Sequence, residues 1–246
     1  MLETFVLTSD RDLWTVRVCA HLFRKHGGQD RPVTVLGFSP PDFDLPPLWT
    51  FLSIGEQADY PIDRWSDALI GWLKGGHRPA DVFALLLSDY WLMRQASWPI
   101  VDVLADWAMK RPRLLRLDLT LDRANERGAV DVAYLAFLDI IKAPATAPYK
   151  VSLQAAIWKR DILLEVLRPG ESPWMFEGRG SAEIANDDRF EVLGTRQAPV
   201  RYVIGIRQGR ASVKGLWQYP PVQLTAADTA ELLKLGLIEP SMVEPA

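Results

Sequence analysis

Short apolar runs alternate with segments of helical period along roughly the first 120 residues of the chain. The runs that predict strands lie at residues 4–8, 32–37, 50–54, 82–87 and 113–119. Between them, the spacing of apolar positions predicts helices from Ser9 or Asp10 to about Lys25, from Asp63 onward, and over residues 99–110. Such alternation is typical of an α/β fold with right-handed crossovers, which is the fold class we expect.

The second half of the chain has a different pattern. Proline and glycine become more frequent, strand-like runs shorten, as at residues 202–206, and a last helix is expected over about residues 226–235. Residues 82–87 are the most apolar run, which predicts a strand buried on both faces, as in a parallel sheet. We predict one domain over residues 1–246, with halves of about 1–120 and 121–246.

Composition narrows the class of protein. Apolar residues make up 48% of the chain, and a net charge of -3 gives no support to broad electrostatic capture of nucleic acid. Cys19 is the one cysteine, which excludes an internal disulfide, and its apolar neighbours predict core packing. Charges near the N-terminus argue against a signal peptide, and no apolar run approaches the ~18 residues of a membrane span. We expect a soluble, cytoplasmic protein.

The most informative segment runs from residue 152 to 178. It reads as an apolar strand carrying Gln154, a short helix, and a Pro/Gly turn that brings Trp174 and Glu177 together. A carboxylate beside an aromatic wall can hold a sugar ring and remove a proton from its hydroxyl. Glu177 is therefore the candidate general base, and Trp158 and Trp174 are candidate stacking platforms. The alternatives are a surface carboxylate for Glu177 and core packing for Trp158.

Polar residues also follow two of the predicted strands. Thr8 and Asp10 come after the first strand, and Asp89 follows the most apolar one. Ligands of open α/β sheets bind beyond the carboxyl ends of strands, where these side chains could contact a nucleoside and a cation-bound diphosphate. The alternatives are a helix-capping box of Ser9 with Asp12, and a turn or cap role for Asp89.

Other patterns carry less weight. Asp118 and Asp122 end a predicted strand, and the three histidines lack metal-ligand spacing. The chain has no P-loop, no Gly-x-Gly-x-x-Gly after a strand and no Gly-x-Ser-x-Gly elbow. Kinases, dehydrogenases and serine hydrolases therefore lack their usual signatures here.

An ordered set of short motifs resembles GT-A-type glycosyltransferases of bacterial polysaccharide loci and tailed phages. The motifs are Thr8-Ser9-Asp10, residues 51–55, 60–67, 85–91, 116–120, Ser152-Leu-Gln154 with Trp158, and residues 172–177. They cover about residues 4 to 217. The resemblance implies a GT-A-like, Rossmann-like fold: a mostly parallel mixed sheet flanked by helices, with a nucleotide-sugar half and a smaller C-terminal acceptor-side half.

The resemblance also implies roles for individual residues. Thr8 and Asp10 would contact the nucleoside, Ser66 the donor, and Asp89 the diphosphate together with Mg²⁺ or Mn²⁺. Gln154, Trp158 and Trp174 would contact the acceptor, and Glu177 would be the base of an inverting reaction. The family usually has Glu-Asp-Tyr where this chain has Ser88-Asp89-Tyr90, so one acid of the pair is replaced.

Two functions follow as hypotheses. The first is a glycosyltransferase that moves a sugar from a nucleoside diphosphate sugar, such as a UDP-sugar, to a glycan, a small molecule or a hydroxymethylated DNA base. The DNA version needs a basic groove, to which Arg207, Arg210 and Lys214 could contribute. The second is a catalytically inactive relative that binds a sugar or a protein partner, and Ser88 is the feature that favours it.

Overall fold

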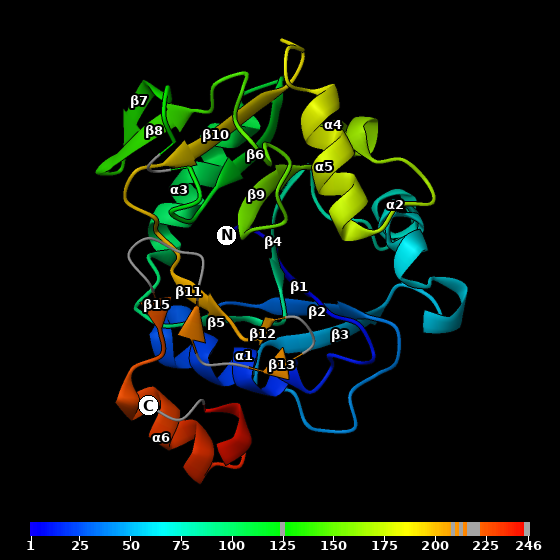
Figure 1. Ribbon diagram of the computed structural model, residues 1–246, viewed down its shortest axis with the longest axis vertical. Coiled ribbons are helices and arrows are strands. Elements are labelled where there is room, and N and C mark those ends of the chain that lie inside the picture. Colours follow the sequence, from blue (N-terminus) through cyan, green and yellow to red (C-terminus); the bar gives the residue numbers. More distant parts are fainter. Residues whose placement is uncertain (124–125, 208–209, 212–213, 216–221, 244–246) are drawn as a thin grey trace.

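The computed structural model describes residues 1–123, 126–207, 210–211, 214–215 and 222–243. Among these residues, nine strands form one sheet in the order β3-β2-β1-β4-β9-β6-β10-β8-β7 (Figure 1). The strands are β1 (Thr4–Leu7), β2 (Val33–Gly37), β3 (Trp49–Ser53), β4 (Val82–Leu87), β6 (Leu114–Asp118), β7 (Val130–Leu135), β8 (Leu138–Lys142), β9 (Ala156–Lys159) and β10 (Glu191–Thr195). Only β9 and β8 run against the other strands, so the predicted α/β fold with a mostly parallel mixed sheet is confirmed.

The chain order of the strands reverses between β1 and β4. From β1 the chain steps outward to β2 and β3, and it then returns to place β4 on the other side of β1. Leu7 and Leu87 are register partners at the carboxyl ends of these two parallel strands. Such a switch point is where open α/β sheets bind ligands, because the crossovers diverge there and leave a crevice.

Helices cover both faces of the sheet (Figure 1). They are α1 (Thr15–Phe23), α2 (Trp65–Lys74), α3 (Trp98–Met109), α4 (Arg160–Val166), α5 (Pro173–Glu183) and α6 (Ala226–Lys234). Successive side chains of a strand point to opposite faces, so β4 contributes Ala84 and Leu86 to one apolar cluster and Phe83 and Leu85 to the other. The first cluster includes residues of α1, α3 and α6, and the second includes residues of α2, α4 and α5.

The burial of β4 and of Cys19 confirms two predictions made from the sequence. All of β4 except its last residue is buried, as expected for a strand covered on both faces, and Cys19 is 1% exposed within the core. Short helical turns complete the loops: η1 (Arg24–Gly28), η2 (Gln57–Asp59), η3 (Ile62–Arg64) and η4 (Pro240–Met242). None of the helices in the described ranges is long and apolar enough to cross a membrane.

Two predicted boundaries are wrong. The first helix begins at Thr15, not at Ser9 or Asp10, because residues 10–14 form a turn in which Ser9 Oγ bonds both the backbone N–H and the carboxylate of Asp12. Gln154 is not on a strand, since β9 begins two residues later at Ala156.

Shorter strands lie beyond the main sheet. β5 (Tyr90–Leu92) pairs antiparallel with β11 (Tyr202–Ile204), β12 (Ile206–Arg207) with β13 (Arg210–Ala211), and β14 (Lys214–Gly215) with β15 (Val222–Gln223). β5 continues directly from the end of β4, and β11 comes from the second half of the chain. Strands from both halves also alternate in the main sheet, where β9 lies between β4 and β6.

Candidate active site

A buried chain of hydroxyl groups joins the carboxyl ends of β1 and β4 to the start of α1. Ser88 Oγ donates to Thr8 Oγ1 at 3.0 Å and lies 2.7 Å from Thr15 Oγ1. All three side chains are almost fully buried. A carboxylate at position 88 would lose its hydration here, at a large cost unless paired. A serine is therefore compatible with this buried position, and its hydroxyl joins the ends of β1 and β4 to the start of α1.

Asp10 lies at the same edge of the sheet and ties two loops to it. Its carboxylate accepts bonds from the backbone N–H and the hydroxyl of Ser39, at 2.9 and 2.8 Å. Its own backbone N–H donates to Gln57 at 3.2 Å. Asp10 is half-buried.

Asp89 is the acid nearest the end of β4, and it is half-buried. Loss of hydration raises the pKa of this carboxyl to about 7, and the negative charge of Asp12 adds to the effect. The nearby backbone N–H groups of Asp89 itself and Ile206 oppose the shift. Asp89 is therefore only partly ionised near neutral pH.

The residues at this edge do not fit a dedicated metal site. Ser88 has its hydroxyl engaged by two threonines, and Asp89 is the one carboxylate that the altered motif offers. In the described part of the chain, no group of three or more His, Cys, Asp and Glu side chains could hold a metal ion. A bound cation would need most of its oxygen ligands from the diphosphate and water.

Ser66 is fully buried, and the predicted contact with a donor does not agree with its position. Its hydroxyl accepts a bond from the backbone N–H of Glu171 at 2.9 Å, and its own N–H donates to the Glu171 carbonyl at 3.0 Å. Ser66 therefore holds the loop before α5 to α2.

Trp174 and Glu177 lie on helix α5, not in the predicted turn. Ser172 caps this helix by accepting from the backbone N–H of Met175, and proline occupies the first helical position, where no N–H is needed. Trp174 is 69% exposed in the first turn, as a stacking platform requires, and Glu177 follows one turn later. Both predicted site residues are therefore held on one rigid element.

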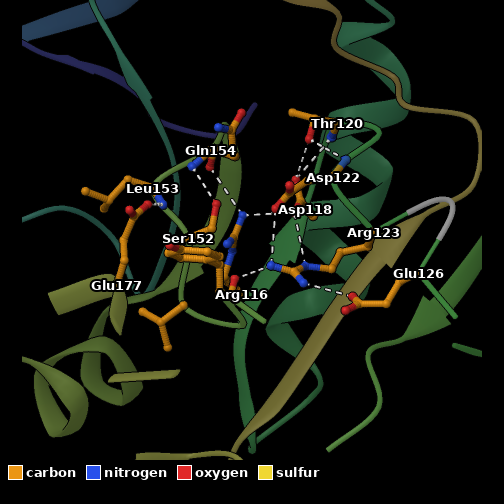
Figure 2. Close-up of polar contacts among 12 residues, drawn as sticks. Arg116, Asp118, Thr120, Asp122, Arg123, Glu126, Ser152, Leu153, Gln154 and Glu177 are labelled. Atoms are coloured by element: carbon orange, nitrogen blue, oxygen red, sulfur yellow. Dashed lines mark hydrogen bonds and ion pairs between the residues drawn. The ribbon is translucent and has the colours of Figure 1, made fainter. Parts of the chain in front are cut away.

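The Glu177 carboxylate is fixed against the segment 152–154, as Figure 2 shows. Its Oε1 accepts the backbone N–H of Leu153 at 2.6 Å. Burial raises the pKa of Glu177, while that hydrogen bond and the positive charge of Arg116 lower it and the charge of Asp122 raises it further. A half-buried carboxylate with a raised pKa is a better base than an exposed one.

Two stacked tyrosines lie behind the same segment. The rings of Tyr90 on β5 and Tyr202 on β11 are 4.2 Å apart and nearly parallel. The Tyr90 hydroxyl donates to the Leu153 carbonyl at 3.2 Å, and the Tyr202 hydroxyl donates to Gln154 Oε1. Burial raises the pKa of both phenols well above 10, so both stay protonated donors.

The tyrosine pair connects the two sides of the site. The charge of Asp89 acts on both phenols, and the charge of Glu177 acts on Tyr90. Asp89 and Glu177 are therefore close enough to the Tyr90 ring for both charges to act on its hydroxyl, although the two acids are far apart in sequence.

Beneath the segment lies a buried network of charges (Figure 2). Arg116 and Asp118 are fully buried and form an ion pair at 3.1 Å, and Arg123 Nε lies 3.8 Å from the same carboxylate. Arg116 also donates to the Gln154 carbonyl at 3.3 Å. Its guanidinium lies over the ring of Trp158, 5.1 Å from the centroid.

Trp158 is 1% exposed, so the prediction that it contacts an acceptor is wrong and the alternative of core packing is confirmed. On β9 its side chain belongs to the second apolar cluster, where it supports Arg116. Tyr90, Tyr202 and Arg116 were not among the predicted site residues. Tyr90 follows Asp89 directly, which is the one sequence signal that could have indicated it.

The predicted basic groove of Arg207, Arg210 and Lys214 stays a prediction, because these side chains lie outside the described part of the chain.

Comparison with known proteins gives structural likeness but no sequence match. No family model matches the chain, and no curated protein matches its sequence. Among solved structures, the chain is similar to the galactosyltransferase LgtC in complex with donor and acceptor sugar analogs, with 13% identity and a TM-score of 0.39. The match covers 67% of this chain and 60% of that one. Similarity of this degree assigns no activity, so the function rests on the site itself.

Proposed function

We propose that this protein is a glycosyltransferase that moves a sugar from a nucleoside diphosphate sugar to a hydroxyl group. The sequence motifs suggest a UDP-sugar as the donor. The switch point between β1 and β4 supports a donor site there, with Asp10 and Asp89 at the carboxyl ends of the strands. The predicted nucleoside contact of the Thr8 hydroxyl does not agree with its position, because this hydroxyl is buried and bonded to Ser88 and to the Ser9 carbonyl. In this account about residues 1–120 bind the donor, and about 121–246 supply the acceptor side.

One observation carries the proposal. The Glu177 carboxylate is half-buried, has a raised pKa and is fixed by the Leu153 N–H at 2.6 Å, next to Gln154 and one helical turn after the exposed ring of Trp174. Its Oε2 has no hydrogen-bond partner among the described residues. A positioned base, a hydrogen-bonding amide and an aromatic platform are together suited to an acceptor sugar.

For these positions we propose the following reaction. Glu177 takes the proton of the acceptor hydroxyl as that oxygen forms a bond to the anomeric carbon. The bond between this carbon and the diphosphate oxygen breaks, and the diphosphate leaves with the electron pair. Attack from the face opposite the leaving group inverts the anomeric centre.

We assign no step to a metal ion, because the residues at the end of β4 do not form a dedicated cation site. The Mg²⁺ or Mn²⁺ that the motifs imply stays a prediction. We favour a glycan or small-molecule acceptor over a hydroxymethylated DNA base, and salt-dependent retention on DNA would separate the two.

A thermal-shift screen tests the donor site. Nucleotides and nucleotide-sugars are added with Mn²⁺, with Mg²⁺ or with EDTA. A donor at ~100 times its Kd should add about 2.7 kcal/mol to the free energy of unfolding. A shift selective for one nucleotide-sugar supports the proposal, and its persistence in EDTA would show that donor binding needs no cation. No shift with any compound argues against a donor site.

The second candidate is a sugar- or protein-binding module without activity. Ser88 favours this inactive candidate. It replaces the usual second acid, and its hydroxyl is already bonded to Thr8 and Thr15. Saccharide binding without any response to nucleotides would support this candidate.

A further inference from the structure

The polar groups of residues 153 and 154 are almost all engaged. The Leu153 N–H donates to Glu177, and the Leu153 carbonyl accepts from Tyr90. The Gln154 N–H donates to Ser152 Oγ at 3.1 Å, and the Gln154 carbonyl accepts from Arg116. The segment is therefore bound to α5, β5 and β6 at once, which leaves its backbone little freedom.

The side-chain amide of Gln154 is fixed through its oxygen. Tyr202 is fully buried and has one hydroxyl proton, which it donates to Gln154 Oε1. Stacking on Tyr90 and pairing of β11 with β5 hold the phenol in place.

The side-chain nitrogen of Gln154 is the one polar group of residues 153 and 154 without a hydrogen bond among the described residues. Within the described residues, Gln154 Nε2 donates no hydrogen bond, and the residue is half-buried. In Figure 2 the side chain leaves the segment on the side opposite Arg116 and its network. An amide held by its oxygen can only offer N–H donors to what it meets next.

We propose that Tyr202 is a positioning residue, which locks Gln154 so that its amide N–H groups select an oxygen of the acceptor that accepts hydrogen bonds. The class of ligand is a neutral saccharide, whose hydroxyl and ring oxygens supply such acceptors. This inference rests on the proposed function for the identity of the ligand, but the lock itself can be measured without any ligand.

The lock is tested by side-chain dynamics. Gln154→Glu identifies the Gln154 Nε2 resonances in the ¹H–¹⁵N spectrum by their loss, and the heteronuclear NOE of these resonances reports picosecond to nanosecond motion. We expect a rigid amide in the wild type and a mobile one in Tyr202→Phe, comparable to the exposed Gln29. Tyr149→Phe is the matched control, because Tyr149 is 62% exposed, and it should leave the NOE unchanged.

A Gln154 amide that is mobile in the wild type, or equally rigid in Tyr202→Phe, overturns the proposal. If Tyr202→Phe does not fold, a mobile amide in the wild type still overturns the proposal.

Kinetics then separate the lock from the proposed function. D-Glucose, D-galactose and N-acetyl-D-glucosamine serve as acceptor probes, and hydrolysis of the donor measures turnover without an acceptor. Tyr202→Phe should raise the KM for the accepted saccharide by about 5- to 10-fold, an effect on the order of one hydrogen bond, and should change kcat less than KM. Gln154→Glu should raise the KM for the same saccharide at least as much.

An unchanged KM in both variants would overturn the selection by Gln154. Absence of donor binding and hydrolysis in the wild type would instead refute the proposed function, and the NOE result would still decide whether the lock exists.

Discussion

Replacing Arg116 by methionine tests whether the charges beneath the site act as a buried network. The side chains of Arg116 and Asp118 have no exposed surface, and their ion pair measures 3.1 Å. Methionine keeps an apolar contact with Trp158 but removes the charge. Asp118 would then have Arg123 as its nearest cation, with Nε at 3.8 Å.

The structure sets the size of the effect. Breaking a buried ion pair by removing one partner costs about 3–5 kcal/mol, because it leaves an uncompensated charge. Two features reduce this cost: Arg123 remains beside the carboxylate, and Arg116 Nε and Nη1 lack hydrogen-bond partners that methionine would no longer need. We therefore expect a loss at the low end, about 3 kcal/mol of the free energy of unfolding.

Urea denaturation followed by tryptophan fluorescence measures this loss. The matched variant is Arg116→Met combined with Asp118→Asn, which keeps an oxygen for the two bonds from Thr120 and removes the stranded charge. It should be more stable than Arg116→Met alone. Arg189→Met, which breaks an exposed pair with Asp187, is the surface control and should change little.

A loss below about 1 kcal/mol in Arg116→Met, or a double variant that is merely additive, would refute the reasoning.

Three further predictions concern the site. The pKa of Asp89 is about 7 in the folded protein and near 3.9 unfolded, so the folded state binds more protons between these values. Stability should therefore fall by about 1–3 kcal/mol as pH rises from 5 to 8, and Asp89→Asn should remove most of this fall in denaturation curves. Trp174→Ala should change stability by less than about 0.5 kcal/mol and weaken saccharide binding, whereas Trp158→Ala should cost about 3–5 kcal/mol, as measured by thermal melts and titration. The apparent pKa of the acidic limb in the pH profile of kcat/KM should lie above the ordinary range of a glutamate, because burial raises the pKa of Glu177. Arg116→Met should raise this apparent pKa further, because it removes a positive charge that lowers it.

The first half of the fold could be predicted from sequence because its elements are locally encoded. The apolar run that ends at Leu87 matches β4 residue for residue, and α2 and α3 keep clear helical spacing. β8 and β10 were missed because their pairing with each other and that of β10 with β6 join segments far apart in sequence. β7 pairs only with the neighbouring β8, and it was missed because most of its residues are exposed and form no apolar run. The predicted start of the first helix lies too close to the N-terminus, because Ser9 and Asp12 form a capping-type bond in a turn that precedes α1.

For the site, sequence could indicate the acids but not their partners. Residue type indicated Glu177 and Trp174 as candidates. Their location on a helix depends on Ser172, which caps the N-terminus of α5. Tyr202 contacts Gln154 from 48 positions away, and only the β5–β11 pairing brings the two together. Trp158 illustrates the opposite error, because an aromatic residue on a strand is compatible with both a platform and a core position.

The most direct test of the account compares Glu177→Gln with Glu183→Gln, which alters an exposed glutamate on the same helix. The measurement is kcat for sugar transfer, with the nucleotide-induced thermal shift as the check on donor binding. The account predicts that Glu177→Gln loses about 10²- to 10⁴-fold in kcat with an unchanged thermal shift, while Glu183→Gln keeps full turnover. Full turnover in Glu177→Gln would contradict its role as the base.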